Sequence, residues 1–93
     1  MANPTIRRRV RYRGDVQGVG FRANAVDQAR GLNLQGFVKN EPDGDVTIDV
    51  QGPQESVETL LRRIAESMDR HINETESDDD ELRDDLPPFR IRY

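Results

Sequence analysis

Apolar residues recur along this chain of 93 residues with two spacings, one typical of strands and one typical of helices. Residues 6–13 alternate, with Ile6, Val10 and Tyr12 on one face and four arginines on the other. The arginines are Arg7, Arg9, Arg11 and Arg13. This alternation predicts a half-buried strand at the start of the chain.

Two later stretches have helical spacing. Residues 21–30 place Phe21, Ala25, Val26 and Ala29 on one face, and Gly31 follows as a C-cap. A second helix is predicted to begin at residues 52–53, because proline suits the first helical position. Its apolar stripe consists of Val57, Leu60, Leu61, Ile64, Ala65 and Met68.

The remaining strands are predicted in two regions. Residues 35–41 and 45–51 alternate around a Pro-Asp-Gly-Asp turn, which indicates a β-hairpin. Residues 72–77 occupy the place of a fourth strand, but Ile72 is their only strong hydrophobe. We predict a mobile acidic loop at residues 78–87 and a final strand at residues 89–93.

This order of strand, helix, strand, strand, helix and strand predicts a single α+β domain over residues 1–93, with residues 1–5 frayed. The fold is a ferredoxin-like α/β sandwich, an antiparallel sheet with two helices on one face (βαββαβ) and an extra C-terminal strand. The other face is expected to be open and polar, with the arginines of the first strand near Thr47, Asp49 and Gln51.

Composition narrows the classes of protein further. The chain has no cysteine and one histidine, His71, which excludes disulfides, thiolate catalysis and multi-histidine metal sites within the chain. It has neither the apolar segment of a signal peptide nor the ~20 apolar residues of a membrane span, so we expect a cytoplasmic monomer. Net charge is −4, and Lys39 is the only lysine, a composition that suggests a salt-rich, halophilic setting. The alternative is an ordinary acidic domain with one acidic loop.

Candidate chemistry is concentrated between the first strand and the first helix, at residues 16–22. Gly18 and Gly20 permit a tight turn that leaves backbone N–H groups uncovered by side chains. A helix that starts directly after the turn adds unpaired N–H donors and a partial positive charge. The guanidinium of Arg22 matches two oxygens of a phosphate. The stretch therefore predicts an anion site, most often one for phosphate.

Three blocks of the sequence, residues 14–22, 36–40 and 42–44, resemble the signature of the acylphosphatase family in order and spacing. Residues 89–93 resemble the usual end of that family. The resemblance implies hydrolysis of the carboxyl–phosphate bond of small acyl phosphates, giving a carboxylate and inorganic phosphate. It implies no cofactor and no metal.

The resemblance also assigns roles. Arg22 would hold the phosphoryl group and Asn40 would place the attacking water, as the two catalytic residues. The backbone of a phosphate-binding loop would complete the site, at Val16, Gln17, Gly18, Val19, Gly20 and Phe21.

Other functions remain as alternatives. One is a non-catalytic anion-binding or regulatory module on the same fold, because fold alone does not decide function. Another is nucleic-acid binding by the arginine face, which the negative net charge and the absence of aromatic residues on that face disfavour. A dinucleotide site is rejected, although residues 18–23 fit its fingerprint, because the next strand opens a hairpin and not a parallel crossover.

Overall fold

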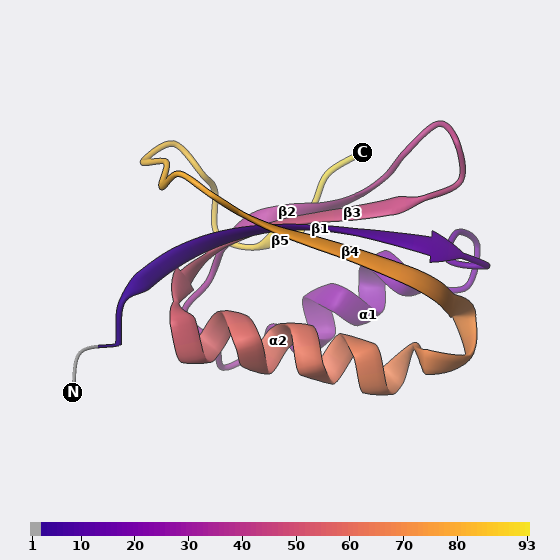
Figure 1. The fold of residues 1–93 in the computed structure, drawn as a ribbon, viewed down its shortest axis with the longest axis horizontal. Coiled ribbons are helices and arrows are strands. Elements are labelled where there is room, and N and C mark those ends of the chain that lie inside the picture. Colours follow the sequence, from indigo (N-terminus) through magenta and orange to yellow (C-terminus); the bar gives the residue numbers. More distant parts are fainter. Residues whose placement is uncertain (1–2) are drawn as a thin grey trace.

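The computed structural model describes residues 3–93, which form a five-stranded sheet with two helices on one face (Figure 1). This confirms the predicted ferredoxin-like sandwich and its extra C-terminal strand. No helix within residues 3–93 is long and apolar enough to cross a membrane. In chain order the elements are β1 (Thr5–Gly14), α1 (Phe21–Gln28), β2 (Gln35–Asn40), β3 (Val46–Pro53), α2 (Gln54–Ser67), the short 3₁₀ turn η1 (Asp69–His71), β4 (Ile72–Asp80) and β5 (Arg90–Ile91).

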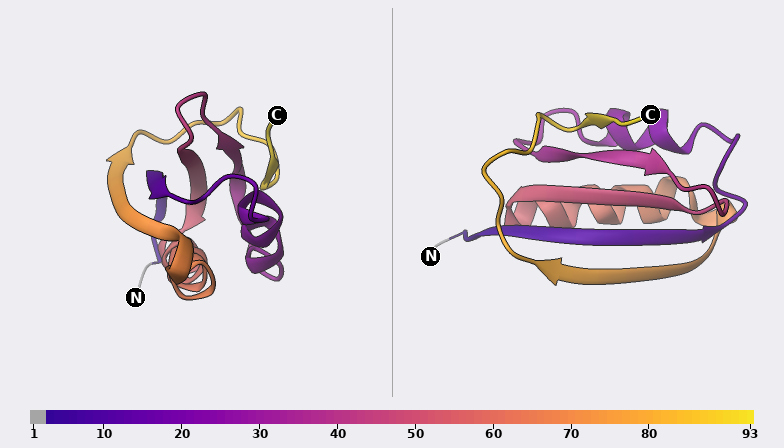
Figure 2. Two further views of the ribbon diagram at one scale, coloured as in Figure 1. Left: turned by 90° about the vertical axis from the view of Figure 1, so that its right-hand side faces the viewer. Right: turned by 90° about the horizontal axis from the view of Figure 1, so that it is seen from above.

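The strands lie in the order β4-β1-β3-β2-β5, so the chain's first strand is near the middle of the sheet (Figure 2). All neighbouring pairs are antiparallel except β2 and β5, which run parallel. The β2–β3 hairpin confirms the predicted turn, in which the N–H of Glu41 donates to the carbonyl of Asp45 over 2.8 Å. The end of β2 therefore lies close to the loop that precedes α1, where the candidate chemistry is concentrated.

The core lies between the sheet and the helices. Val10 and Tyr12 of β1 pair with Ile48 and Val46 of β3 on the covered side, and all four are buried. Val57, Leu60 and Ile64 present the apolar face of α2, as predicted. Ala65 is exposed, contrary to the prediction, because it lies on the flank of that stripe and its side chain is too short to reach the sheet.

Several element boundaries differ from the predicted ones, and the strand predicted at residues 89–93 spans only Arg90–Ile91. α1 ends at Gln28, because the chain leaves the helix toward Gly31, whose φ of +79° is left-handed. β3 continues through Pro53, because Thr5 and Ile6 of β1 pair with its last two residues. Pro53 is therefore the N-cap of α2 and not its first helical residue.

β4 is longer than predicted: the sequence indicated a short strand at residues 72–77 followed by an acidic loop from residue 78. It extends to Asp80, and its carboxylates lie opposite the arginines of β1. Arg7 is paired in register with Asp80, Arg9 with Asp78 and Arg11 with Glu76. The sequence did not reveal the full length of this strand because opposite charges, and not apolar side chains, face each other across the pair.

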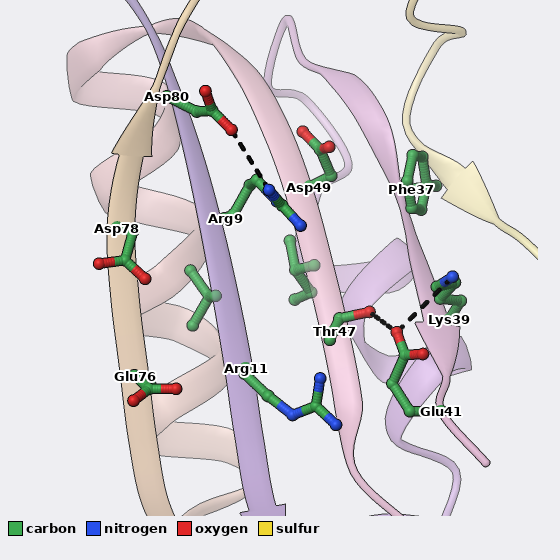
Figure 3. Close-up of a pocket in the computed structure, with 12 residues that line it drawn as sticks. Arg9, Arg11, Phe37, Lys39, Glu41, Thr47, Asp49, Glu76, Asp78 and Asp80 are labelled. Atoms are coloured by element: carbon green, nitrogen blue, oxygen red, sulfur yellow. Dashed lines mark hydrogen bonds and ion pairs between the residues drawn. The ribbon is translucent and has the colours of Figure 1, made fainter.

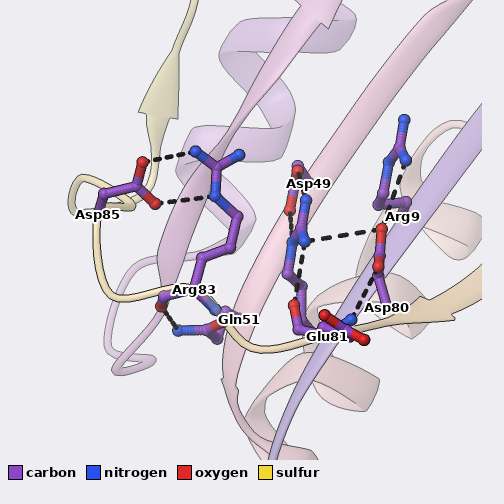
Figure 4. A network of polar contacts seen from close by, with 8 residues as sticks. Arg9, Asp49, Gln51, Asp80, Glu81, Arg83 and Asp85 are labelled. Atoms are coloured by element: carbon purple, nitrogen blue, oxygen red, sulfur yellow. Dashed lines mark hydrogen bonds and ion pairs between the residues drawn. The ribbon is translucent and has the colours of Figure 1, made fainter.

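The segment between β4 and β5 crosses one end of the open sheet face (Figure 4). Gln51 donates from Nε2 to the carbonyl of Arg83 over 2.6 Å, and the N–H of Arg83 donates back to Gln51 Oε1 over 2.8 Å. Leu86 is buried. These contacts give the segment a defined path; the mobility predicted for it in solution stays a prediction.

Candidate active site

The loop between β1 and α1 forms one wall of a pocket of about 240 Å³. Gly18 and Gly20 have φ values of +77° and +79°, a left-handed conformation that side-chain-bearing residues rarely adopt. No heavy atom lies within 4 Å of a side-chain carbon built at either glycine, so the open space in front of them is available to a ligand. The two glycines thus turn the chain sharply and keep its backbone accessible.

α1 begins where this loop ends. Gly20 is its N-cap, and the first helical hydrogen bond runs from the N–H of Asn24 to the carbonyl of Gly20 over 2.9 Å. The helix starts without an acidic residue in its first turn, so no carboxylate competes for its free N–H groups. Val16 and Phe21 are buried beneath the loop, where Phe21 packs on Tyr12 with ring centroids 4.9 Å apart. This packing fixes the start of the helix against the core.

Arg22 projects from the first turn of α1 into the pocket. Its guanidinium carbon lies 5.0 Å from the centroid of the Tyr93 ring, close enough for a cation–π contact. No ion pair within residues 3–93 involves Arg22. Stacking occupies a face of the guanidinium and leaves the N–H groups at its edge for an oxyanion.

Asn40 enters the same pocket from the end of β2. Its backbone pairs with Val46 across the hairpin, so the rigid part of the sheet holds it at the pocket rim. An amide side chain can accept one hydrogen bond while it donates another, which suits it to hold a water molecule in a fixed orientation. The two predicted catalytic side chains, from different elements, therefore meet at one cavity.

The pocket lining includes residues that the sequence prediction missed. Ile91 and Tyr93 line it from the C-terminal segment, and Tyr93 is 95% exposed. Alternation at residues 89–93 suggested that Ile91 and Tyr93 lie on the same face of a strand. Nothing in the sequence indicates that this strand, β5, pairs with β2 rather than with the opposite edge of the sheet. The full lining is Val16, Gly18, Gly20, Phe21, Arg22, Ala23, Asn40, Ile91 and Tyr93.

Gln17 and Val19 belong to the predicted loop but do not line the pocket. Val19 packs against the hydrophobic core. The side chain of Gln17 turns toward the β2–β3 hairpin and donates to the carbonyls of Glu41 and Asp45. Their side chains thus anchor the loop on its two sides.

A wider hollow of about 480 Å³ lies on the open sheet face (Figure 3). Its cations are matched by nearby acids: Arg9 with Asp80, and Lys39 with Glu41. Arg11 likewise binds carboxylates of the hairpin turn, with Nε 2.6 Å from an oxygen of Asp45. Because these charges already have partners, the smaller pocket at Arg22 is the better site for an anion.

Comparison with known proteins agrees with this geometry. The profile of the acylphosphatase family matches residues 8–91, which include the loop, Arg22 and Asn40. The chain belongs to the acylphosphatase family. An acylphosphatase from Salinibacter ruber is 35% identical over 83 residues, covering 88% of this chain and 87% of that protein.

Solved structures of the family have the same fold. The acylphosphatase from Bacillus subtilis superposes with a TM-score of 0.82 at 26% identity, over 95% of this chain and 99% of that one. The acylphosphatase from Coxiella burnetii gives a TM-score of 0.80 at 28% identity, over 95% and 93% of the two chains. Each match extends over nearly the whole domain.

Proposed function

We propose that this acylphosphatase-family chain hydrolyses the carboxyl–phosphate bond of small acyl phosphates, with Arg22 and the loop at residues 16–21 binding the phosphoryl group and Asn40 orienting the water. The observation that carries the proposal is that Arg22, Asn40 and the two left-handed glycines line one pocket at the N-terminus of α1. Family membership favours an enzyme over the non-catalytic anion-binding module.

The chemistry needs little more than this pocket supplies. An acyl phosphate is a mixed anhydride with a good carboxylate leaving group, so no nucleophilic side chain is required. Backbone N–H groups and a guanidinium offset charge on the equatorial oxygens, and a fixed water attacks in line. Asn40 cannot act as a base near neutral pH, so the water's proton passes to a phosphate oxygen of the substrate. We therefore expect turnover without added metal and a flat pH profile around neutrality.

The direct test is hydrolysis of benzoyl phosphate by the purified chain in the presence of a metal chelator. We expect stoichiometric release of benzoate and phosphate, with inorganic phosphate as a competitive inhibitor. Binding of phosphate without turnover would favour the anion-binding module instead.

The chain is also proposed to act as a monomer in the cytoplasm. Both edges of the sheet support the monomer: β4 is acidic along its exposed length, and β5 has only two residues. Short or charged edges oppose pairing with a second copy. Sedimentation or light scattering at neutral pH tests this.

A further inference from the structure

We propose that Gln17 is a positioning residue, whose side-chain amide sets the distance between the phosphate-binding loop and Asn40. This inference rests on the proposed function, because it concerns the alignment of the two groups that hold phosphate and water. It assigns to Gln17 a role through its side chain, in addition to the backbone role predicted for it.

The amide of Gln17 bridges two carbonyl oxygens of the hairpin turn. Nε2 lies 2.7 Å from the carbonyl of Glu41 and 2.9 Å from that of Asp45. Both partners can only accept, so the nitrogen and not the oxygen must face them, and both of its N–H groups are used. Gln17 is half-buried, which shields these bonds from water.

The bridged turn carries Asn40 directly. Glu41 is the next residue along the chain, and its own N–H donates to the same Asp45 carbonyl over 2.8 Å. On the other side, Gly18 follows Gln17 and lines the pocket. The Gln17 side chain thus connects Glu41, which is adjacent to Asn40, with the loop that contains Gly18.

This connection matters because the other anchors of the loop, Val16, Val19 and Phe21, lie on the core side, whereas Gln17 ties the loop to the hairpin. Gly18 and Gly20 have no side chains to pack toward the hairpin, so on that side the distance between the loop and the hairpin depends on the Gln17 amide. Arg22 and the loop N–H groups would move together with a bound phosphate. Asn40 would stay with the sheet, so a shift separates the water from the phosphorus without weakening the phosphate contacts.

The expected signature of losing the tether is a fall in kcat with little change in phosphate affinity. A misplacement on the order of 1 Å can cost about a hundredfold in rate. For Gln17→Leu we expect kcat on benzoyl phosphate to fall about 10- to 100-fold, while the Kd for inorganic phosphate changes by less than about threefold. Gln17→Ala, which leaves room for water between the two carbonyls, serves as the second variant should leucine not be accommodated.

Gln51→Leu is the matched control. Gln51 also donates from Nε2 to a backbone carbonyl, that of Arg83 over 2.6 Å, but it ties the segment after β4 on the open sheet face. Its loss should lower the melting temperature without lowering kcat. If Gln51→Leu and Gln17→Leu reduce kcat equally, the effect is one of general stability and the proposal is wrong.

A double-mutant cycle provides the decisive measurement. If Gln17 acts through Asn40, Gln17→Leu should cost far less in the Asn40→Ala background than in the wild type. Equal losses in both backgrounds, or a loss of phosphate affinity as large as the loss of kcat, would overturn the proposal. Failure of the proposed function is distinguished separately, because in that case the wild type itself would not hydrolyse benzoyl phosphate.

Discussion

Arg22 differs from most other arginines of the chain in having an aromatic ring, and not a carboxylate, beside its guanidinium. Arg7, Arg8, Arg9, Arg11 and Arg13 of β1 all form ion pairs. A carboxylate next to Arg22 would compete with phosphate for the same N–H groups, whereas the Tyr93 ring does not. The positive charge at the pocket is therefore available to substrate.

Arg22 and Asn40 should separate in their effects on binding and turnover. The charge of Arg22 is present in ground and transition states, so Arg22→Ala should weaken phosphate binding as well as turnover, by roughly 1.5–3 kcal/mol. Asn40→Ala should lower kcat strongly while phosphate still binds nearly as in the wild type. Calorimetry with inorganic phosphate and kinetics on benzoyl phosphate measure the two effects.

Asn40→Asp sharpens this comparison. It keeps the side-chain size but places a negative charge beside a phosphate dianion, so binding should weaken too. If Asn40→Ala retained full turnover, or lost phosphate affinity as badly as Arg22→Ala, the division of roles between the two residues would be incorrect.

Arg7 and Asp49 form the buried ion pair of the open face. Nε and Nη2 of Arg7 lie 2.9 and 2.8 Å from the two carboxylate oxygens, and the side chains are 8% and 9% exposed. This hydrogen-bonded carboxylate raises the pKa of Arg7, so the guanidinium stays charged. The cover over the pair is a single layer of chain, the segment after β4, whose Glu81 carbonyl accepts from Arg7 over 3.0 Å.

Removing Asp49 from its ion pair with Arg7 should leave the buried charge of the guanidinium uncompensated. We expect Asp49→Ala to lower the free energy of unfolding by about 2–3 kcal/mol, at the low end for buried pairs because the cover is thin. The matched control is Asp79→Ala, because Asp79 pairs with Arg8 but is 79% exposed and should contribute little. Urea denaturation of both variants makes the comparison, and equal losses would contradict it.

The candidate site shows which residues a sequence can and cannot predict. Gly18, Gly20 and Arg22 were predicted because a glycine-rich turn before a helix has a local physical meaning. The roles of Tyr93 and of the Gln17 side chain were not, because each contacts a partner from a distant part of the chain. Alternation and spacing describe neighbours along the chain, and these two contacts depend on how the elements assemble.

Among the elements, β4 shows how a strand can form with few hydrophobes. Its side chains beyond Ile72 are exposed, and it adheres to β1 through backbone hydrogen bonds and cross-strand pairs of opposite charge. β3 and α2 were predictable because their apolar residues keep strict periods. β4 was predictable in position, from the order of elements, but not in length.

The acids around β1 should make the protein sensitive to low pH. The N–H of Glu81 and nearby arginines hold the pKa of Asp80 below its usual range, and the N–H of Asp45 together with Arg11 does the same for Asp43. A carboxyl whose pKa is lower in the folded state stabilises that state above its unfolded pKa of about 3.9. This contribution is lost as the pH falls through the folded pKa, so we expect the melting temperature to fall below about pH 4, by a small amount because both carboxyls are accessible to solvent.

Neutralising the end of β4 tests the same element independently. Changing Asp78, Asp79 and Asp80 together to Asn should remove the part of this acid dependence that comes from Asp80 and leave turnover at neutral pH nearly intact, because β4 lies at the sheet edge away from the pocket. A collapse of turnover with the fold retained would mean that β4 contributes to catalysis.

For the whole molecule, the excess of acids predicts a response to salt. Net charge is −4, and its self-repulsion should be screened as the Debye length falls from ~30 Å in dilute buffer to ~3 Å near 1 M salt. We expect the melting temperature to rise with potassium chloride, although the rise is reduced because acids of β4 already pair with arginines. A level or falling melting temperature would remove the argument for salt adaptation.

The overall architecture was the most predictable level of description. The order of predicted strands and helices, joined by short loops, is compatible with few topologies in a chain of 93 residues. The choice of sheet edge for the last strand was not predictable, because residues 89–93 alternate in a way that suits either edge. That choice determines which residues line the pocket.

The charged edge at β4 has a consequence for aggregation. At neutral pH its carboxylates repel a second molecule, and they keep the outermost backbone groups from recruiting another strand. Acid removes this repulsion and at the same time weakens the attachment of β4 to β1. Below about pH 4 the edge of β4 would therefore lose its repulsive charges, whereas β1 keeps the positive charges of its arginines. We therefore expect the protein to assemble into fibrils at acid pH but not at neutral pH.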